Sequence, residues 1–232
     1  MTLKVLTAGA TREGFSECAS AFKSQTGIAI DTATTHGHLI HEQVIVGQTN
    51  ADMVLLPSHM IEDLQQKGLA SDTDCIEIGV IRIGAAVRAA ETVPDVSTLD
   101  SLTQTLLSAR SLVLTTAPSG VHMDTLIGRL GLSVKLADRI TRYDTGTMVN
   151  EHLIESELAG EVAFGVATEI LFCRDKGVAY AGPIPEKVQM SHRYCAVRLN
   201  RSDKVAPVRQ LLDYLQTVDA RSVFASTGVD QE

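Results

Sequence analysis

Aromatic residues are scarce in this sequence of 232 residues, which has no tryptophan, five Phe and four Tyr. Proteins that bind single-stranded nucleic acid usually stack the bases on aromatic side chains. The net charge also argues against a nucleic-acid partner, because 28 acidic and 20 basic residues give a net charge of −8. Such a charge opposes broad binding to phosphate backbones or anionic lipid, although it permits a local positive pocket. We therefore expect no nucleic-acid partner and no stable membrane association.

Cysteine is also rare and dispersed, at Cys18, Cys75, Cys173 and Cys195, with no C-x-x-C spacing. Neither a disulfide framework nor a thiolate metal site is indicated, so we expect buried free thiols. No apolar run reaches transmembrane length. The sequence contains neither G-x-G-x-x-G nor a P-loop, and we expect no cofactor and no metal.

The first residues, Met1–Leu6, enter an apolar strand directly, without the basic stretch, long apolar run and cleavage site of a secretory signal. This start predicts a cytoplasmic protein. The alternative is a trimmed mature form with a new Met, in which case the protein would be periplasmic and a transporter permease would be a partner.

Strand-like and helix-like apolar spacings alternate through the first 65 residues. Residues 3–6, 28–34 and 52–56 are short apolar segments typical of strands. Between the first two, Phe15, Cys18, Ala19 and Phe22 repeat at helical spacing before Gly27. A second helix is expected over 39–47 and a third from Pro57 toward Leu64. This β-α-β-α-β order favours a parallel sheet.

The second half repeats the pattern after a long apolar stretch, Ile76–Ala90, which we interpret as a strand leaving the first lobe. Helices are expected over 98–107 and 119–130, and strands over 111–114 and 162–166. A returning strand over 192–199 precedes a closing helix over 205–215, with Ser202 or Asp203 as its N-cap. These elements predict an α/β protein whose residues 1–80 and 197–232 form lobe 1 and whose residues 81–196 form lobe 2. Two crossing strands join these lobes, each a mainly parallel sheet flanked by helices.

Several short motifs occur in an order that resembles the periplasmic molybdate-binding proteins and their relatives among the type II solute-binding proteins. They are Val5–Ala10, Ala21–Lys23 with Gly27, Asn50–Met53, Ala117–Gly120, Gly160–Glu161 with Gly165, and Leu211–Leu215 before Val223–Phe224. The resemblance extends over nearly the whole chain. It implies two α/β lobes that close on a small anion, held in the cleft by helix N-termini and loop hydroxyls.

The ligand positions depart from those of the molybdate-binding proteins. Ala10 and Thr11 stand where that family has a serine after its first strand, and Gly37 lies nearest its second serine. Thr168 aligns with a family tyrosine, whereas the Pro118–Gly120 loop is kept. The resemblance therefore implies that anion binding is retained without molybdate specificity, and we expect the ligand to be an organic carboxylate or an oxyanion.

The candidate ligand-binding residues lie at expected strand-to-helix junctions or loops, or come from this alignment. Unpaired N–H groups and the helix dipole favour an anion at helix N-termini. The residues are Ala10, Thr11, Arg12, Gly37, Ser119, Gly120, Thr145, Thr147, Asn150 and Thr168. Ordinary N-capping is the alternative role for each hydroxyl. Arg12 either pairs with a ligand carboxylate or is a solvated first-turn residue.

An enzymatic alternative remains, because relatives of the molybdate-binding proteins include aconitate isomerases, which move a proton between carbons of a tricarboxylic acid. Such chemistry needs a base close to an acidic C–H and donors for the developing charge. His36 or His38 would be that base, and Glu169 is a second candidate. If the protein only binds its ligand, the imidazoles would donate hydrogen bonds to a carboxylate.

Two further interpretations, a metal site and a regulator's sensor domain, have less support in the sequence. His36, His38 and His41 form an H-x-H-x-x-H stretch, but no carboxylate cluster or Cys accompanies it, so we do not expect a metal site. A regulator's sensor domain would require an N-terminal helix-turn-helix, which is lacking. We therefore favour a substrate-binding protein, with an aconitate isomerase-like enzyme as the alternative.

Overall fold

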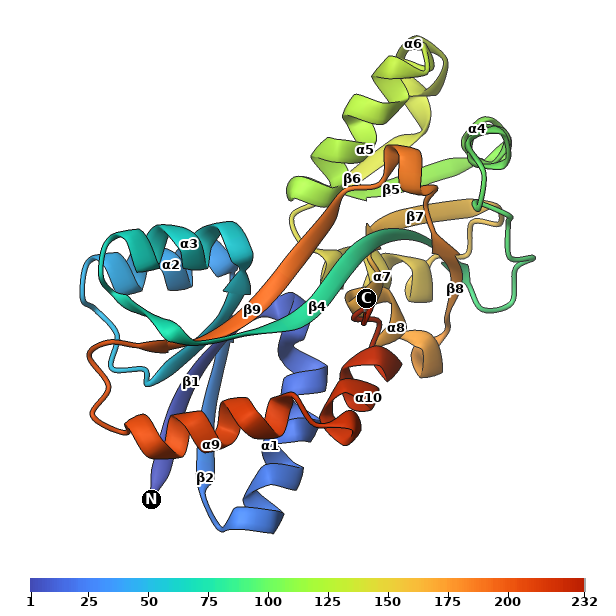
Figure 1. Ribbon diagram of the computed structural model, residues 1–232. Helices are drawn as coiled ribbons and strands as arrows, with labels where there is room; N and C mark the ends of the chain where they lie inside the picture. The colour runs from blue at the N-terminus through green and yellow to red at the C-terminus, as the bar shows by residue number, and fades with distance from the viewer. Residues whose placement is uncertain (232) are drawn as a thin grey trace. The chain divides into compact units, whose positions relative to one another are not determined.

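The computed structural model describes residues 1–231 and has a mixed α/β fold (Figure 1), which confirms the predicted class. By its internal contacts the chain divides into two compact units. Unit 1 contains residues 1–81 and the chain from His192 onward, and unit 2 contains residues 82–191. Within residues 1–231, no helix combines the length and the hydrophobicity needed to cross a bilayer.

Unit 1 begins with the predicted β-α-β-α-β run. Its elements are β1 (Thr2–Ala8), the 3-10 turn η1 (Gly9–Thr11), α1 (Arg12–Thr26), β2 (Ala29–Thr35), α2 (Gly37–Ile45), β3 (Met53–Pro57) and α3 (Ser58–Gln66). The strand β1 lies between β2 and β3 and is parallel to both, with Val5 opposite Thr32 and Met53. Helix α1 buries the four residues that repeat at helical spacing and ends at Gly27, whose φ of 72° a glycine adopts without strain.

Two long strands and two helices complete unit 1. Strand β4 (Ala70–Arg88) continues into unit 2, and β9 (Ser191–Leu199) returns and pairs antiparallel with β3. Helices α9 (Val205–Leu215) and α10 (Val218–Ser226) follow, and α10 packs on α1. The apolar stretch from Ile76 predicted the position of β4. It did not predict where the strand begins, because residues 70–75 are mostly polar.

The predicted N-cap of α9 is wrong, because the capping position is Lys204 and no side chain caps the helix. Ser202 is instead engaged by Asp52, whose Oδ1 accepts from the Ser202 hydroxyl at 2.7 Å. Lys4 N–H and Lys204 Nζ donate to Asp52 Oδ2 at 2.8 and 2.9 Å. Burial would raise the pKa of Asp52, but these hydrogen bonds lower it overall.

Unit 2 contains a second sheet with helices. Its elements after β4 are α4 (Leu99–Ser108), β5 (Ser111–Thr115), α5 (Pro118–Arg129), α6 (Ser133–Leu136), η2 (Ala137–Arg139), β6 (Ile140–Tyr143), α7 (Gly146–Glu155), β7 (Glu161–Val166), α8 (Ala167–Leu171), η3 (Arg174–Lys176), β8 (Val178–Pro183) and η4 (Glu186–Val188). Strand β5 is parallel to β6 and β7, whereas β4 is antiparallel to β7 and β8. The predicted helices α4 and α5 and strands β5 and β7 are confirmed. Strands β6 and β8 were not predicted.

Candidate functional site

The β1–α1 turn in unit 1 holds Ala10, Thr11 and Arg12. Thr11 is buried, and its Oγ1 lies 2.7 Å from Thr7 Oγ1 and 3.2 Å from the Ala8 carbonyl oxygen to which it donates. Arg12 is exposed, and its Nε pairs with Glu13 at 2.7 Å. The Thr11 hydroxyl is thus engaged within the turn. It can donate to a ligand only by giving up its hydrogen bond to the Ala8 carbonyl oxygen.

The β2–α2 turn, also in unit 1, presents His36 as the N-cap of α2, followed by Gly37 and His38. Both imidazoles are exposed, and their ring centroids lie 5.6 Å apart. His41 differs, because its Nε2 lies 2.8 Å from Asp63 Oδ2. The described residues include no group of three or more His, Cys, Asp or Glu side chains that could hold a metal ion.

In unit 2, the β5–α5 turn places Ser119 and Gly120 in the first turn of α5. Ser119 is buried, and its Oγ shares a 3.3 Å hydrogen bond with Thr115 Oγ1. A Cβ added at Gly120 would lie 1.8 Å from the Thr115 carbonyl oxygen. Gly120 is therefore required by the close approach of α5 to β5, whether or not it also contacts a ligand.

The N-terminus of α7 in unit 2 is capped by Thr145, whose Oγ1 accepts from Met148 N–H at 3.2 Å. Thr147 is exposed beside it. The carboxylate of Glu169, from α8, lies over Gly146, where an added Cβ would come 1.7 Å from Glu169 Oε2. A carboxylate is a favourable neighbour of a helix N-terminus, because the helix dipole is positive there.

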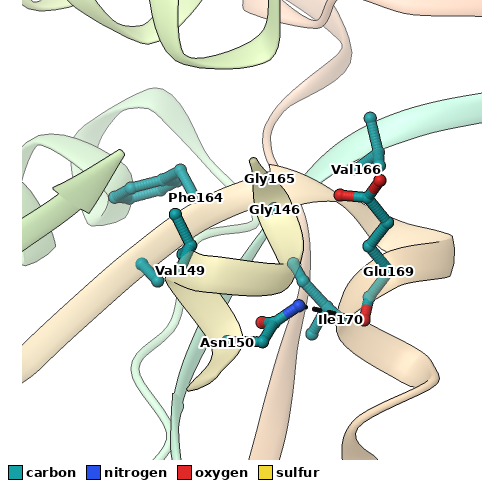
Figure 2. Close-up of a pocket in the computed structure, with 9 residues that line it drawn as sticks. Gly146, Val149, Asn150, Phe164, Gly165, Val166, Glu169 and Ile170 are labelled. Carbon is teal, nitrogen blue, oxygen red and sulfur yellow. Dashed lines mark hydrogen bonds between the residues drawn. The ribbon is translucent and has the colours of Figure 1, made fainter. Parts of the chain in front are cut away.

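A pocket in unit 2, which we call the α7 pocket, is formed by α7, β7 and α8. It is lined by Gly146, Val149, Asn150, residues 163–166, Glu169 and Ile170. Figure 2 shows the Asn150 amide nitrogen turned toward the Glu169 carbonyl, to which it donates at 3.0 Å. The sequence patterns identified Asn150 and Glu169 but missed the apolar members Val149, Phe164 and Ile170, whose spacing is that of ordinary core residues.

Two oxygens in unit 2 stand out among the described residues. Asn150 Oδ1 and Thr168 Oγ1 are buried and have no hydrogen-bond partner. Buried polar atoms are nearly always paired in folded proteins, so each of these needs an explanation, such as a water or a bound ligand. Asn150 Oδ1 can only accept, whereas the Thr168 hydroxyl can both accept and donate.

The predicted site residues therefore fall into two groups. Ala10, Thr11, Arg12, His36, Gly37 and His38 belong to unit 1, and Ser119, Gly120, Thr145, Thr147, Asn150, Thr168 and Glu169 belong to unit 2. Within unit 2, the structure brings Asn150 and Glu169 together in one pocket beside the capped N-terminus of α7. Their ligand-binding and catalytic roles remain predictions.

Known proteins similar to this chain agree on the fold. Among solved structures, the periplasmic molybdate-binding protein of Azotobacter vinelandii superposes with a TM-score of 0.75 at 17% identity, over 99% of both chains. The sulfate-binding protein of Mycobacterium tuberculosis gives a TM-score of 0.73 at 17% identity, over 99% of this chain and 86% of that one. These likenesses confirm the resemblance to the type II periplasmic binding proteins and their two-lobed fold.

A curated relative adds a different activity. The chain is 26% identical to an aconitate isomerase from a Pseudomonas species, over 98% of this chain and 87% of that protein. A family model described as bacterial extracellular solute-binding protein matches residues 3–230. The chain therefore belongs to this family of bacterial extracellular solute-binding proteins.

Proposed function

We propose that this solute-binding protein of the molybdate-binding type takes a small organic anion with carboxylate groups. The observation that carries the proposal is Asn150 Oδ1, a buried acceptor without a partner in the α7 pocket. A ligand group that donates a hydrogen bond, such as a hydroxyl or a protonated carboxyl, would satisfy this oxygen. Molybdate and sulfate are fully deprotonated near neutral pH and have no such hydrogen, whereas an organic acid has one where it carries a hydroxyl, as citrate does, or where a carboxyl stays protonated in the pocket.

The surroundings of Asn150 limit how a ligand could reach it. Val149, Phe164 and Ile170 line the pocket with carbon, and its free space is about that of one water, so only the end of a ligand could reach Asn150 Oδ1. The N-terminal N–H groups of α7 lie nearby in the same unit, but Glu169 already places a carboxylate there, so a ligand carboxylate would reach them only if the Glu169 side chain moved. In unit 1, Arg12 and the exposed His36 and His38 stay predicted donors to ligand carboxylates.

Calorimetric titration tests the proposal with citrate, cis-aconitate, trans-aconitate, molybdate and sulfate as ligands. We expect a carboxylate to bind more tightly than either inorganic oxyanion. Tight molybdate binding without any response to the carboxylates would overturn the proposal.

A matched pair of variants on α5 tests whether the predicted residue Ser119 contacts the ligand. Ser119→Ala removes a buried hydroxyl in the first turn of α5 and should weaken binding by roughly five- to tenfold, the value of one hydrogen bond of about 1–1.5 kcal/mol. Thr125→Ala is the control, because it removes an exposed hydroxyl that donates to Val121 O on the same helix at 2.9 Å. It should leave binding unchanged.

We also propose, as a second candidate, that the protein isomerises its ligand by moving a proton between carbons, as an aconitate isomerase would. The similarity to an aconitate isomerase over 98% of the chain favours this candidate. Glu169 is one candidate base for the proton transfer, because it lines the α7 pocket. His36 and His38 are the other bases.

Ultraviolet and NMR spectra of cis- and trans-aconitate incubated with the protein in deuterated water separate the two candidates. Deuterium incorporation or interconversion of the isomers indicates an isomerase. Binding without either change indicates a solute-binding protein, for which a membrane permease would be the partner if the protein is exported.

A further inference from the structure

Two of the four cysteines are not the buried thiols that their spacing predicted. Cys75 on β4 and Cys195 on β9 are only half-buried, whereas Cys18 and Cys173 are buried. Each of the two thiols affects the pKa of the other, so they are neighbours. Both residues belong to unit 1, where β4 and β9 are neighbouring strands (Figure 1).

A neighbouring ion pair shows how the two strands are aligned at this point. Glu77 lies two residues after Cys75, Arg193 lies two residues before Cys195, and these two charged side chains pair with each other. Alternate residues of a strand point to the same face. The two pairs have the spacing of successive cross-strand pairs in an antiparallel alignment, and such an alignment would set Cys75 opposite Cys195.

This placement suits a disulfide. Directly opposite residues in antiparallel strands have Cα atoms about 4.5–5.5 Å apart, and disulfides occur at Cα separations of about 4.4–6.8 Å. We propose that Cys75 and Cys195 form a reversible dithiol–disulfide site, oxidised by a peroxide or by a small-molecule disulfide. Oxidation would tie together the two strands through which the chain leaves and re-enters unit 1.

The two thiols have different roles in this reaction. The hydrogen bond from Cys195 lowers the pKa of Cys75, and the same hydrogen bond, together with burial, raises the pKa of Cys195. These directions favour Cys75 as the attacking thiolate and Cys195 as the resolving thiol, an assignment that the single-cysteine variants test. By contrast, burial, with a contribution from Glu17, raises the pKa of Cys18 to about 12, and its thiol is inert.

With hydrogen peroxide, the Cys75 thiolate attacks one peroxide oxygen, the O–O bond breaks, and the products are a sulfenic acid and hydroxide. The Cys195 sulfur then attacks the Cys75 sulfur, forming the S–S bond and displacing the sulfenic oxygen, which leaves as water with the Cys195 proton. The proton first released by Cys75 neutralises the hydroxide. In sum, two thiols are oxidised and one peroxide is reduced to two waters.

Peptide mapping of the intact protein tests the proposal. The folded protein is treated with hydrogen peroxide, blocked with iodoacetamide and digested with trypsin, which places each cysteine on its own peptide. We expect residues 68–82 and 194–198 to appear as one cross-linked species that lacks two hydrogens and separates on treatment with dithiothreitol. The peptides that carry Cys18 and Cys173 should remain unlinked.

Variants identify the attacking thiol. Cys195→Ser should accumulate a sulfenic acid at Cys75 that dimedone traps, whereas Cys75→Ser should give no comparable adduct at Cys195. The proposal is overturned if the folded wild-type protein shows no 75–195 cross-link, or if Cys18 or Cys173 is linked instead. The wild-type map decides the matter even if a variant fails to fold.

Discussion

The proposed bases are of two chemical kinds, the Glu169 carboxylate and the His36 and His38 imidazoles. Glu169 lies over the N-terminus of α7 in unit 2, and the two imidazoles are exposed at the β2–α2 turn of unit 1. If Glu169 is the base, Glu169→Gln should lower the rate of deuterium exchange into bound aconitate by about a hundred- to ten-thousand-fold. NMR of the exchanging ligand measures this rate.

Affinity distinguishes a base from a ligand contact in the same experiment. His36→Gln and His38→Gln should then leave the exchange rate nearly unchanged and weaken binding only by the value of a hydrogen bond to a charged group, about 1.5–3 kcal/mol. The opposite pattern, with exchange lost in a histidine variant and kept in Glu169→Gln, would assign the base to unit 1.

At the scale of single elements, two helix caps of the same type separate stability from binding. Thr145 caps α7 and Thr98 caps α4, each by accepting from a backbone N–H, at 3.2 and 3.1 Å. Thr145→Ala and Thr98→Ala should each lower the free energy of unfolding by about 1 kcal/mol. Only Thr145→Ala should also weaken ligand binding, because α7 borders the α7 pocket and α4 does not. Urea unfolding and calorimetry measure the two effects, and equal affinities in both variants would contradict the placement of the ligand.

Helix α5 provides a second comparison within one element. Gly120→Ala would place a Cβ 1.8 Å from the Thr115 carbonyl oxygen, so the helix must move, and we expect a loss of about 1–3 kcal/mol in the free energy of unfolding. Gly128→Ala on the same helix has open space, with Ser133 Oγ at 3.6 Å. It should stabilise the protein by about 0.5–1 kcal/mol through helix propensity. Thermal or urea unfolding of both variants checks the contrast.

Two buried carboxylates tie distant parts of unit 1 together and predict how the whole chain responds to acid. Hydrogen bonds from Arg209 and then Arg198, both at 2.6 Å, lower the pKa of Asp74, and the pKa of Asp52 is also lowered. A carboxyl whose folded pKa is depressed stabilises the fold above its unfolded pKa, about 3.9, and this stability is lost as pH falls through the folded pKa.

We therefore expect the free energy of unfolding to fall as pH is lowered from about 5 toward 2. In Asp74→Asn the fall should be shallower, because one of the carboxyl groups whose pKa is lowered by folding is absent. Urea unfolding at a series of pH values measures this slope. An unchanged slope in the variant would show that Asp74 has the same pKa in the folded and unfolded chains.

Much of the fold could be predicted from local patterns. Strands β1, β3, β5 and β7 are short apolar runs, and α1 and α9 carry their buried residues at helical spacing. Strand β6 was missed because its four residues are only half-buried or exposed, which leaves no alternation to detect. Strand β8 was missed because its residues are mostly half-buried and it contains Gly182 and Pro183.

The sequence by itself determined the α/β class and the junctions at which Thr11 and Ser119 stand, because strand and helix periodicity and turn residues are local properties of the chain. Only the tertiary structure decided what each polar group does. It engages Thr11 with Thr7, leaves Asn150 Oδ1 without a partner and sets Cys75 against Cys195. The physical reason is that a hydrogen bond or a disulfide depends on which atoms meet in space, and residues far apart in the chain meet only after the strands have paired.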